Sequence, residues 1–269
     1  MPNLKLKIGC TAQELERAQR LRFEVFDLEM NKNPGFKPPA SGLDKDEFDG
    51  ICEHIIVIDE DKGLVVGTYR MLLRSVADRH QGFYSETKFN IDAIKKLPGE
   101  QLEVGRSCVH KDYRDNQVLN LLWQGIVQYT IAHQAKYIFG CANILTADLR
   151  EIQEYCSMFK TLGLLGEMHV TPRHPAHAIS IDGLEVPNPK EIYQKLPTLF
   201  KGYMNIGLKV CGLPVKGDFG TAVFFVVLDI QNMNKSYKRR FFGDYLATIC
   251  FLFISFLDPC ASLNPSWFL

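Results

Sequence analysis

The chain has 269 residues, and its 31 basic and 31 acidic side chains give a formal net charge of zero. Hydrophobic residues make up 46% and charged residues 23%, the balance of an ordinary globular protein with a substantial core. This charge balance excludes the strong overall positive charge that is typical of nucleic-acid binders. We therefore expect no nucleic-acid partner.

The eight cysteines are scattered along the chain and contain no CxxC pair. This usage predicts reduced, mostly buried thiols, with neither a disulfide framework nor a zinc site. The first ten residues, MPNLKLKIGC, lack the long apolar core of a signal peptide. Together these features predict a cytoplasmic protein without a bound metal.

A helix is predicted after Thr11, because Glu14 follows it at the spacing of a capping box. Apolar residues then recur at helical spacing, at Leu15, Ala18, Leu21, Val25 and Leu28. A loop rich in proline and glycine follows over residues 31–50 and ends in the acidic segment DKDEFD. Loops of this length in a compact domain are often binding segments.

The following elements alternate between strands and helices. Residues 51–59 and 64–73 predict a strand pair joined by a turn. Further patterns predict a short helix over 90–97, a strand over 102–109, a helix over 116–133, a strand over 137–144, helices over 148–162 and 192–207, and a strand over 223–228. Residues 163–190 are expected to be irregular. This mixture of hairpins and crossover helices predicts an α/β or α+β sheet layered with helices.

The C-terminal region combines basic and apolar residues. A basic helix is predicted from about residue 234, with Lys235, Lys238, Arg239 and Arg240 ahead of an apolar run at 246–257. This run is shorter than the roughly 20 residues that span a membrane. It could anchor the protein at an anionic membrane surface or form a terminal core helix. We expect one domain over 1–242 and an apolar tail over 243–269.

The most informative segment is LEVGRSCV at residues 102–109. Glu103 and Arg106 place opposite charges in a half-buried strand, which is costly unless they are paired or used. Gly105 lies between them, where a strand glycine usually marks a bulge or a close backbone approach. The pair is therefore either an internal salt bridge that braces the strand or part of a reaction site.

Several strings in a fixed order place this segment in a known context. VVGTYRMLL, FYSETKFN, LEVGRSCVHKDYR and the long string from LFKGYMNIGL to FFVVLDI resemble the acyl-homoserine-lactone synthases and N-acyl amino acid synthases. Within that group the likeness is greatest to the bacterial ornithine N-acyltransferases of ornithine-lipid synthesis, often labelled hemolysin-like. It runs from about residue 8 to about residue 242. It implies an acetyltransferase-like, mixed, mostly antiparallel central sheet that is splayed and flanked by helices.

The resemblance also implies an activity. The expected reaction moves a 3-hydroxy fatty acyl chain from acyl carrier protein to the α-amine of ornithine, giving lyso-ornithine lipid. Glycine or another amino acid could replace ornithine as the acceptor. A signal synthase of the homoserine-lactone type and a non-catalytic, membrane-associated protein are the other interpretations.

The resemblance implies functional positions at Arg22, Phe26, Asp46, Asp49, Arg70, Glu103 and Arg106. Glu103 is the candidate base or water relay, with a pKa that nearby Arg106 would lower, and Gly105 would expose backbone N–H groups to the thioester carbonyl. Arg22 and Arg70 could bind a substrate carboxylate or pair with acidic residues of the chain. Asp46 and Asp49 could meet the cationic side chain of ornithine or hold the acidic loop. Phe26 could also be ordinary core.

The expected donor follows from a departure from the acetyltransferase pattern. Residues 114–119, RDNQVL, lack the glycines that hold the coenzyme A pyrophosphate at a helix N-terminus, and they add an acid. An acyl carrier protein with its phosphopantetheine thioester is therefore the expected donor, with no bound cofactor. Carrier proteins are acidic, so the candidate docking residues are Lys111, Arg114, Lys201 and Lys209. Cys108 lacks a recognisable base, so direct transfer is expected rather than an acyl-enzyme.

Overall fold

The computed structural model describes residues 2–31, 35–179, 188–217 and 220–242. The chain divides into two units, Met1–Met233 and Asn234–Leu269. In the second unit the described part is the basic helix α8 (Lys235–Phe242), as the sequence predicts. The apolar tail expected over 243–269 lies outside the described residues.

The first unit is built on a seven-stranded sheet with the order β1-β2-β3-β5-β6-β9-β8. The strands are β1 (Leu4–Ile8), β2 (Glu53–Asp59), β3 (Leu64–Leu73), β5 (Glu100–Val109), β6 (Ala135–Ile144), β8 (Lys209–Lys216) and β9 (Ala222–Asp229). Every neighbouring pair is antiparallel except β5 and β6, which are parallel. A separate two-stranded sheet pairs β4 (Phe89–Asn90) with β7 (Thr171–Pro172). The predicted mixed, mostly antiparallel sheet flanked by helices is confirmed.

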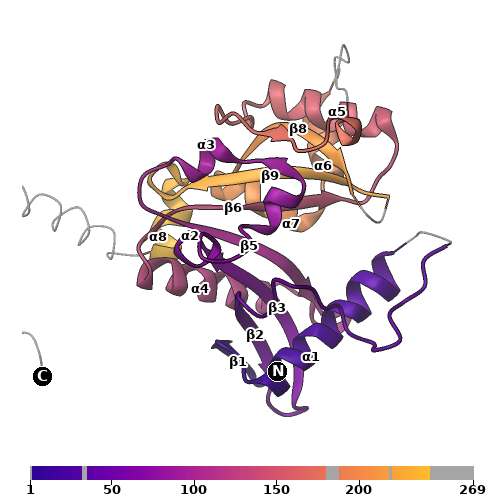
Figure 1. The fold of residues 1–269 in the computed structure, drawn as a ribbon, viewed down its shortest axis with the longest axis vertical. Coiled ribbons are helices and arrows are strands. Elements are labelled where there is room, and N and C mark those ends of the chain that lie inside the picture. Colours follow the sequence, from indigo (N-terminus) through magenta and orange to yellow (C-terminus); the bar gives the residue numbers. More distant parts are fainter. Residues whose placement is uncertain (1, 32–34, 180–187, 218–219, 243–269) are drawn as a thin grey trace, which may run out of the picture. The chain divides into compact units, whose positions relative to one another are not determined.

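Helices cover both faces of this sheet (Figure 1). The longer ones are α1 (Ala12–Arg22), the π-helix η1 (Phe23–Met30), α4 (Gln117–Ala132), α5 (Leu149–Thr161), α6 (Pro189–Lys195) and α7 (Thr198–Ile206). The short ones are α2 (Arg74–Ala77), η2 (Tyr84–Thr87), α3 (Asp92–Lys95), η3 (Lys111–Tyr113), η4 (Pro175–His177) and η5 (Ile230–Asn232). Leu21 of α1 packs with Ile56 in one core cluster, whereas Gly125 of α4 lies against Ile55. Because Ile55 and Ile56 are adjacent in β2, α1 and α4 cover opposite faces.

The first helix begins as predicted but ends differently. The Thr11 hydroxyl accepts the N–H of Glu14 and the Glu14 carboxylate accepts the N–H of Thr11, which completes the capping box. From Phe23 the chain continues as a π-helix, whose i→i+5 hydrogen bonds change the angular spacing of the side chains. Leu28 is therefore 56% exposed, and its predicted place on the buried face is wrong.

The predicted helix over 192–207 is also wrong as a single element. Pro197 separates α6 from α7, because a proline lacks the N–H that a continuous helix requires. The strands β1 and β8 were not predicted. β8 contains Gly212 and Pro214, and its register with β9 shifts between Cys211 and Val215, so its sequence lacks regular strand alternation.

The central strands separate halfway along their length. The β5–β6 pairing runs from Glu100↔Ala135 to Glu103↔Phe139, although both strands continue beyond it. A Cβ atom at Gly140 would lie 2.2 Å from the carbonyl oxygen of Val104, so only glycine fits where the strands part. The predicted splay is thereby confirmed, and it opens a space between the two faces of the sheet.

Candidate active site

A cavity of about 540 Å³ lies at the opening between β5 and β6. Its lining comes from both faces of the sheet, because successive strand residues point to opposite sides. On the face covered by α1 it is lined by Arg70, Tyr84, Glu103 and Arg106, among others. On the face covered by α4 it is lined by Leu119, Phe200 and Tyr203, among others. Two substrates could therefore approach the same point from opposite faces.

Glu103 is the buried carboxylate of this cavity, with 6% of its surface exposed. Its Oε2 accepts the N–H of Tyr84 at 2.9 Å, and its Oε1 accepts the N–H of Ser85 at 2.7 Å. Burial raises the pKa of Glu103, although these hydrogen bonds and the charge of Arg70 oppose the rise. The expected lowering by Arg106 is wrong, because Arg106 forms its ion pairs with Asp44 and Asp46 instead.

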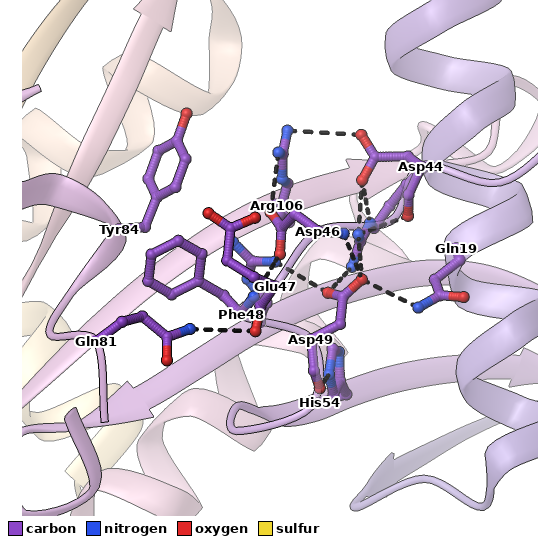
Figure 2. A network of polar contacts seen from close by, with 12 residues as sticks. Gln19, Asp44, Asp46, Glu47, Phe48, Asp49, His54, Gln81, Tyr84 and Arg106 are labelled. Carbon is purple, nitrogen blue, oxygen red and sulfur yellow. Dashed lines mark hydrogen bonds and ion pairs between the residues drawn. The ribbon is translucent and has the colours of Figure 1, made fainter. Parts of the chain in front are cut away.

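Next to the cavity, three arginines meet three aspartates in one polar network (Figure 2). The arginines come from three different elements, α1, β3 and β5, whereas the aspartates all come from the acidic loop. The members are Arg22, Arg70 and Arg106 with Asp44, Asp46 and Asp49. We call this set the Arg–Asp network.

Arg22 lies wholly inside the Arg–Asp network, with no exposed surface. Its Nε and Nη2 donate to Asp44 Oδ1 at 2.8 and 2.6 Å, and its Nη1 donates to Asp49 Oδ1 at 2.8 Å. A substrate carboxylate cannot reach a guanidinium enclosed in this way. Of the two interpretations of Arg22, the structure therefore favours pairing with the acidic loop.

The carboxylates of Asp46 and Asp49 are also bonded to arginines of the Arg–Asp network. Arg70 Nη1 donates to Asp46 Oδ1 at 2.5 Å and to Asp49 Oδ1 at 2.9 Å. Burial alone would raise the pKa of Asp49, but hydrogen bonds from Arg22 and Arg70 outweigh it and hold the pKa well below its usual range. The pKa of Asp46 is lowered for the same reason, chiefly by Arg70. Neither carboxylate lines the cavity, so the structure favours their role in holding the loop.

Arg106 has an unusual backbone and an incompletely paired side chain. Its φ is +49°, in the left-handed region that non-glycine residues rarely adopt. It lies in a bulge, because Thr68 pairs with Cys108 whereas Arg70 pairs with Gly105. Its Nη2 is 3.1 Å from Asp46 Oδ2, while its Nε is buried without a hydrogen-bond partner among the described residues.

Gly105 has a different role from the one expected of a bulge glycine. The left-handed residue of the bulge is Arg106, and Gly105 is not among the residues with positive φ. A Cβ atom at Gly105 would meet nothing within 4 Å, so no close backbone approach requires this glycine. Gly105 does line the cavity, where it leaves room beside the separated strand.

Two aromatic residues complete the α1 face of the cavity. Phe26 lines the cavity and also packs against the core cluster of α1, so both of its predicted roles stay open. Tyr84 was not predicted, yet its ring lies 5.6 Å from the Arg106 guanidinium and 6.0 Å from that of Arg70. Its turn could have been found from the string FYSETKFN, in which Glu86 follows Phe83 at the spacing of a helix cap.

The four candidate docking residues come from separate segments: Lys111 from η3, Arg114 from the turn after it, Lys201 from α7 and Lys209 from β8. Arg114 lines the cavity and forms two hydrogen bonds with Glu29, at 2.6 and 2.8 Å. Lys201 Nζ donates to a backbone oxygen of Gln194 at 3.1 Å, and Lys209 Nζ donates to that of Gly163 at 2.7 Å. Lys111 is exposed.

Three cysteines, Cys52, Cys108 and Cys141, line the cavity. Burial raises the pKa of Cys52 and of Cys141 to about 12, and it raises the pKa of Cys108 as well. Because the thiolate is the nucleophile, these thiols are poorly suited to form an acyl-enzyme. Within the described ranges, no group of three or more acidic, histidine or cysteine residues could hold a metal ion.

Residues 21–124 match the family model of the acetyltransferase (GNAT) domain. Among solved structures, the chain is similar to FeeM, an N-acyl amino acid synthase from uncultured soil microbes, at 10% identity and a TM-score of 0.48, over 86% of this chain and 93% of that one. It is also similar to the AHL synthase LasI, at 12% identity and a TM-score of 0.46, over 86% and 93% of the two chains. The domain match and the splayed sheet place the protein in the class of N-acyltransferases.

Curated relatives narrow this class further. The L-ornithine N(alpha)-acyltransferase of Rhizobium meliloti (strain 1021) is 32% identical over 90% of this chain and 85% of the relative. That of Brucella abortus (strain 2308) is 30% identical over 87% of both chains. The chain belongs to the L-ornithine N(alpha)-acyltransferase family.

Proposed function

We propose that this protein transfers a fatty acyl chain from acyl carrier protein to the α-amine of ornithine. The product is an N-acyl ornithine, the lyso form of an ornithine lipid. The observation that carries the acceptor assignment is the 32% identity, over 90% of the chain, to a curated ornithine N-acyltransferase. The donor and the residue roles below are argued from the site.

The acceptor amine must lose a proton before or during its attack on the thioester carbonyl. Glu103 is the carboxylate at the point where β5 and β6 part, and burial raises its pKa toward that of a useful base. The N–H groups of Tyr84 and Ser85 hold its two oxygens in place. In the reaction the C–N bond forms, the C–S bond breaks, and the amine proton passes to Glu103 directly or through one water. The phosphopantetheine sulfur leaves as a thiolate, which takes up a proton to give the free thiol of the carrier protein.

The thioester carbonyl gains negative charge as the amine attacks. Beyond Glu103 the strand β5 has no pairing with β6, so its N–H groups on that side are not used by the sheet. Such fixed backbone donors stabilise a developing oxyanion effectively in a cavity that excludes water. We assign this role to the stretch from Val104 to Arg106, which lines the cavity.

The acceptor carboxylate needs a cation on the Glu103 face of the cavity. Arg106 fits this need, because it lines the cavity, is 23% exposed at its side chain and has an unpartnered Nε–H. Arg70 also lines the cavity and adds positive charge, while Asp46 fixes both guanidinium groups. Arg22 does not contact the substrate; it holds in place the loop that carries Asp46 and Asp49.

The donor assignment rests on the start of α4. Asp115 Oδ1 accepts the N–H of Gln117, the first residue of this helix, at 3.1 Å. A coenzyme A pyrophosphate at this position would meet a carboxylate instead of free N–H groups. This supports acyl carrier protein as the donor, with Lys111, Arg114, Lys201 and Lys209 as candidate docking residues.

A membrane surface is a further proposed partner, because the N-acyl ornithine is amphiphilic. The described helix α8 carries Lys235, Lys238 and Arg239, which could bind anionic headgroups. None of the described helices is long and apolar enough to cross a membrane. Co-sedimentation with anionic but not with neutral vesicles would support this peripheral attachment at the inner membrane face, and equal binding to both would contradict it.

The proposed reaction is tested by incubating the purified protein with acyl carrier protein loaded with a fatty acid and with a panel of amino acids. Mass spectrometry should detect N-acyl ornithine, and it should detect much less when acyl-coenzyme A replaces the carrier protein. Equal use of acyl-coenzyme A would overturn the donor assignment. Amide formation with glycine but not with ornithine would overturn the acceptor, and no amide with any acceptor would overturn the reaction.

A further inference from the structure

The first residue of the short helix η2, Tyr84, contacts two functional groups of the site at once. Its main-chain N–H donates to Oε2 of Glu103 at 2.9 Å. Its ring centroid lies 5.6 Å from the guanidinium carbon of Arg106. Tyr84 itself lines the cavity and is half-buried. One residue therefore contacts both the proposed base and the proposed cation of the acceptor site.

The main chain of Tyr84 is fixed by the residues on either side of it. Phe83 is 1% exposed, and its ring centroid lies 4.9 Å from that of Phe139 on β6. Ser85 has no exposed surface, and its N–H is bonded to the other oxygen of Glu103. Because both neighbours are packed in this way, the main-chain position of Tyr84 does not depend on its own side chain. The ring and the main-chain N–H can therefore be tested separately.

The acidic loop holds Arg106 less tightly than it holds the other two arginines of the Arg–Asp network. The hydrogen bonds from Arg22 and Arg70 to aspartate oxygens are 2.5–2.9 Å long. The nitrogens of Arg106 lie 3.1 Å from Asp46 and 3.5 Å from Asp44, beyond the roughly 2.7–2.9 Å of a charge-assisted hydrogen bond. A long side chain with such loose ion pairs needs a further contact to stay in one position. The aromatic ring of η2 supplies that contact.

The ring of Tyr84 is suited to hold a guanidinium group. The face of an aromatic ring attracts a cation, and the attraction is stronger where water is excluded. The ring packs edge-on against Phe48, with centroids 5.8 Å apart and 81° between the ring planes (Figure 2). The guanidinium of Arg70, which is 5% exposed, lies 6.0 Å from the same ring. The ring is thus fixed by its own packing and lies beside two cations that line the cavity.

We propose that Tyr84 is a positioning residue whose main chain holds Glu103 and whose ring holds Arg106, so that η2 sets the separation between base and cation. This inference rests on the proposed acyl transfer to an α-amino acid. In such an acceptor the amine and the carboxylate are attached to the same carbon, so the groups that bind them must be held at a fixed separation. Loss of the ring leaves the base in place and lets the cation move.

The test removes only the ring. Tyr84→Leu keeps an apolar side chain and the main-chain N–H but has no aromatic face. With acyl carrier protein donor at saturation, the KM for ornithine should rise about three- to thirtyfold, the range of a cation–π contact. The acidic limb assigned to Glu103 should stay in place, because its hydrogen bond to the main chain is kept. The KM for ornithinamide, which lacks the carboxylate charge, should change by less than about twofold.

Three further variants complete the comparison. Tyr84→Phe restores the ring and should return the KM for ornithine to within about threefold of that of the unchanged protein. Tyr84→Met removes the ring with a different side chain and should behave as Tyr84→Leu does. Tyr129→Leu is the matched control, because Tyr129 is another half-buried tyrosine, contacts His133 on α4's C-terminal side and is not among the residues that line the cavity. It should keep the KM of the unchanged protein, and the thermal unfolding midpoint checks the fold of each variant.

Equal rises in KM for ornithine and ornithinamide would overturn the inference, because the ring would then act on the acceptor directly and not through Arg106. An unchanged KM in the folded ring-free variants would also overturn it, while continued amide formation would leave the proposed reaction intact. A lost or shifted acidic limb would show that the ring and the main chain do not act separately. In an Arg106→Gly background, Tyr84→Leu should add less than about twofold to the KM for ornithine, and a full additional rise would contradict action through Arg106.

Discussion

The guanidinium of Arg22 is bonded to Asp49, and Asp49 is bonded in turn to Arg70, so one carboxylate joins the first helix to the third strand. Arg22 has no exposed surface and Asp49 has 5%. The acidic loop is thereby attached to the sheet through charges that never meet solvent. Removing either charge leaves the other buried without its partner.

Arg22→Ala should therefore cost about 3–5 kcal/mol of unfolding free energy, because Asp44 and Asp49 lose their partner. Urea denaturation measures this loss. Arg20→Ala on the same helix is the control, since Arg20 pairs with Glu16 at the surface and its loss should cost within about 1 kcal/mol. Similar costs for the two variants would contradict the structural role of Arg22.

Glu103→Gln should lower kcat by about 10²–10⁴-fold if Glu103 takes the amine proton. The amide keeps the size of the side chain, but its NH2 group cannot accept the N–H of Tyr84 or Ser85 that it would face, so the thermal unfolding midpoint of the variant is measured beside kcat. A raised pKa means that the base becomes active only as pH rises through that value, so the acidic limb of the kcat/KM profile should vanish in the variant. An unchanged limb would assign it to another group.

Arg106→Gly should separate stability from substrate binding. Glycine adopts the left-handed backbone of residue 106 without strain, which offsets part of the loss of the ion pairs with Asp44 and Asp46. The KM for ornithine should nevertheless rise at least tenfold, because the carboxylate loses its charged partner. Arg106→Lys keeps the charge and should lie between the two proteins. An unchanged KM in Arg106→Gly would remove this residue from the acceptor site.

Gly140→Ala should disrupt the opening of the sheet, because the new methyl group would lie 2.2 Å from the backbone oxygen of Val104. We expect a loss of about 2 kcal/mol or more in unfolding free energy. Gly105→Ala is the matched control, since nothing lies within 4 Å of its new methyl group. Its stability should change by less than about 1 kcal/mol, and an equal loss at both positions would contradict the described register.

The stability of the protein should fall in acid partly through Asp49. Its pKa in the folded chain lies below the ordinary value, so its contribution is fully present above about pH 4 and is lost as pH falls toward the folded pKa. Asp49→Asn removes this contribution at neutral pH and should flatten the decline of stability below about pH 4. Parallel pH curves for the two proteins would show that Asp49 does not titrate as described.

Much of this architecture follows from local sequence patterns. The capping box at Thr11, the hairpin over 53–73 and the central strand are visible because each depends on neighbouring residues alone. The charged residues of the strand LEVGRSCV also indicate a special site. Their actual partners are set by the bulge at Arg106, and no sequence rule predicts a left-handed arginine.

Other features depend on contacts between distant segments. The pairing of Tyr69 with Tyr203 joins residues 134 positions apart, and the hydrogen bonds from Tyr84 and Ser85 to Glu103 span about twenty positions. The π-helix that exposes Leu28 follows a sequence with an ordinary helical pattern. These features need the folded chain, because each is decided by packing and not by local propensity.

The acidic loop contributes its carboxylates from one short segment, Asp44-x-Asp46-x-x-Asp49, while its arginine partners sit on regular elements. One hexapeptide therefore supplies all three carboxylates of the Arg–Asp network, while the three arginines are held by α1, β3 and β5. Phe48, which lies between two of these aspartates, is 3% exposed, and its ring lies 5.6 Å from the Arg70 guanidinium, so the same segment also packs into the core. Exchanging the hexapeptide as a whole would therefore change the charge beside the cavity and the packing beneath it together.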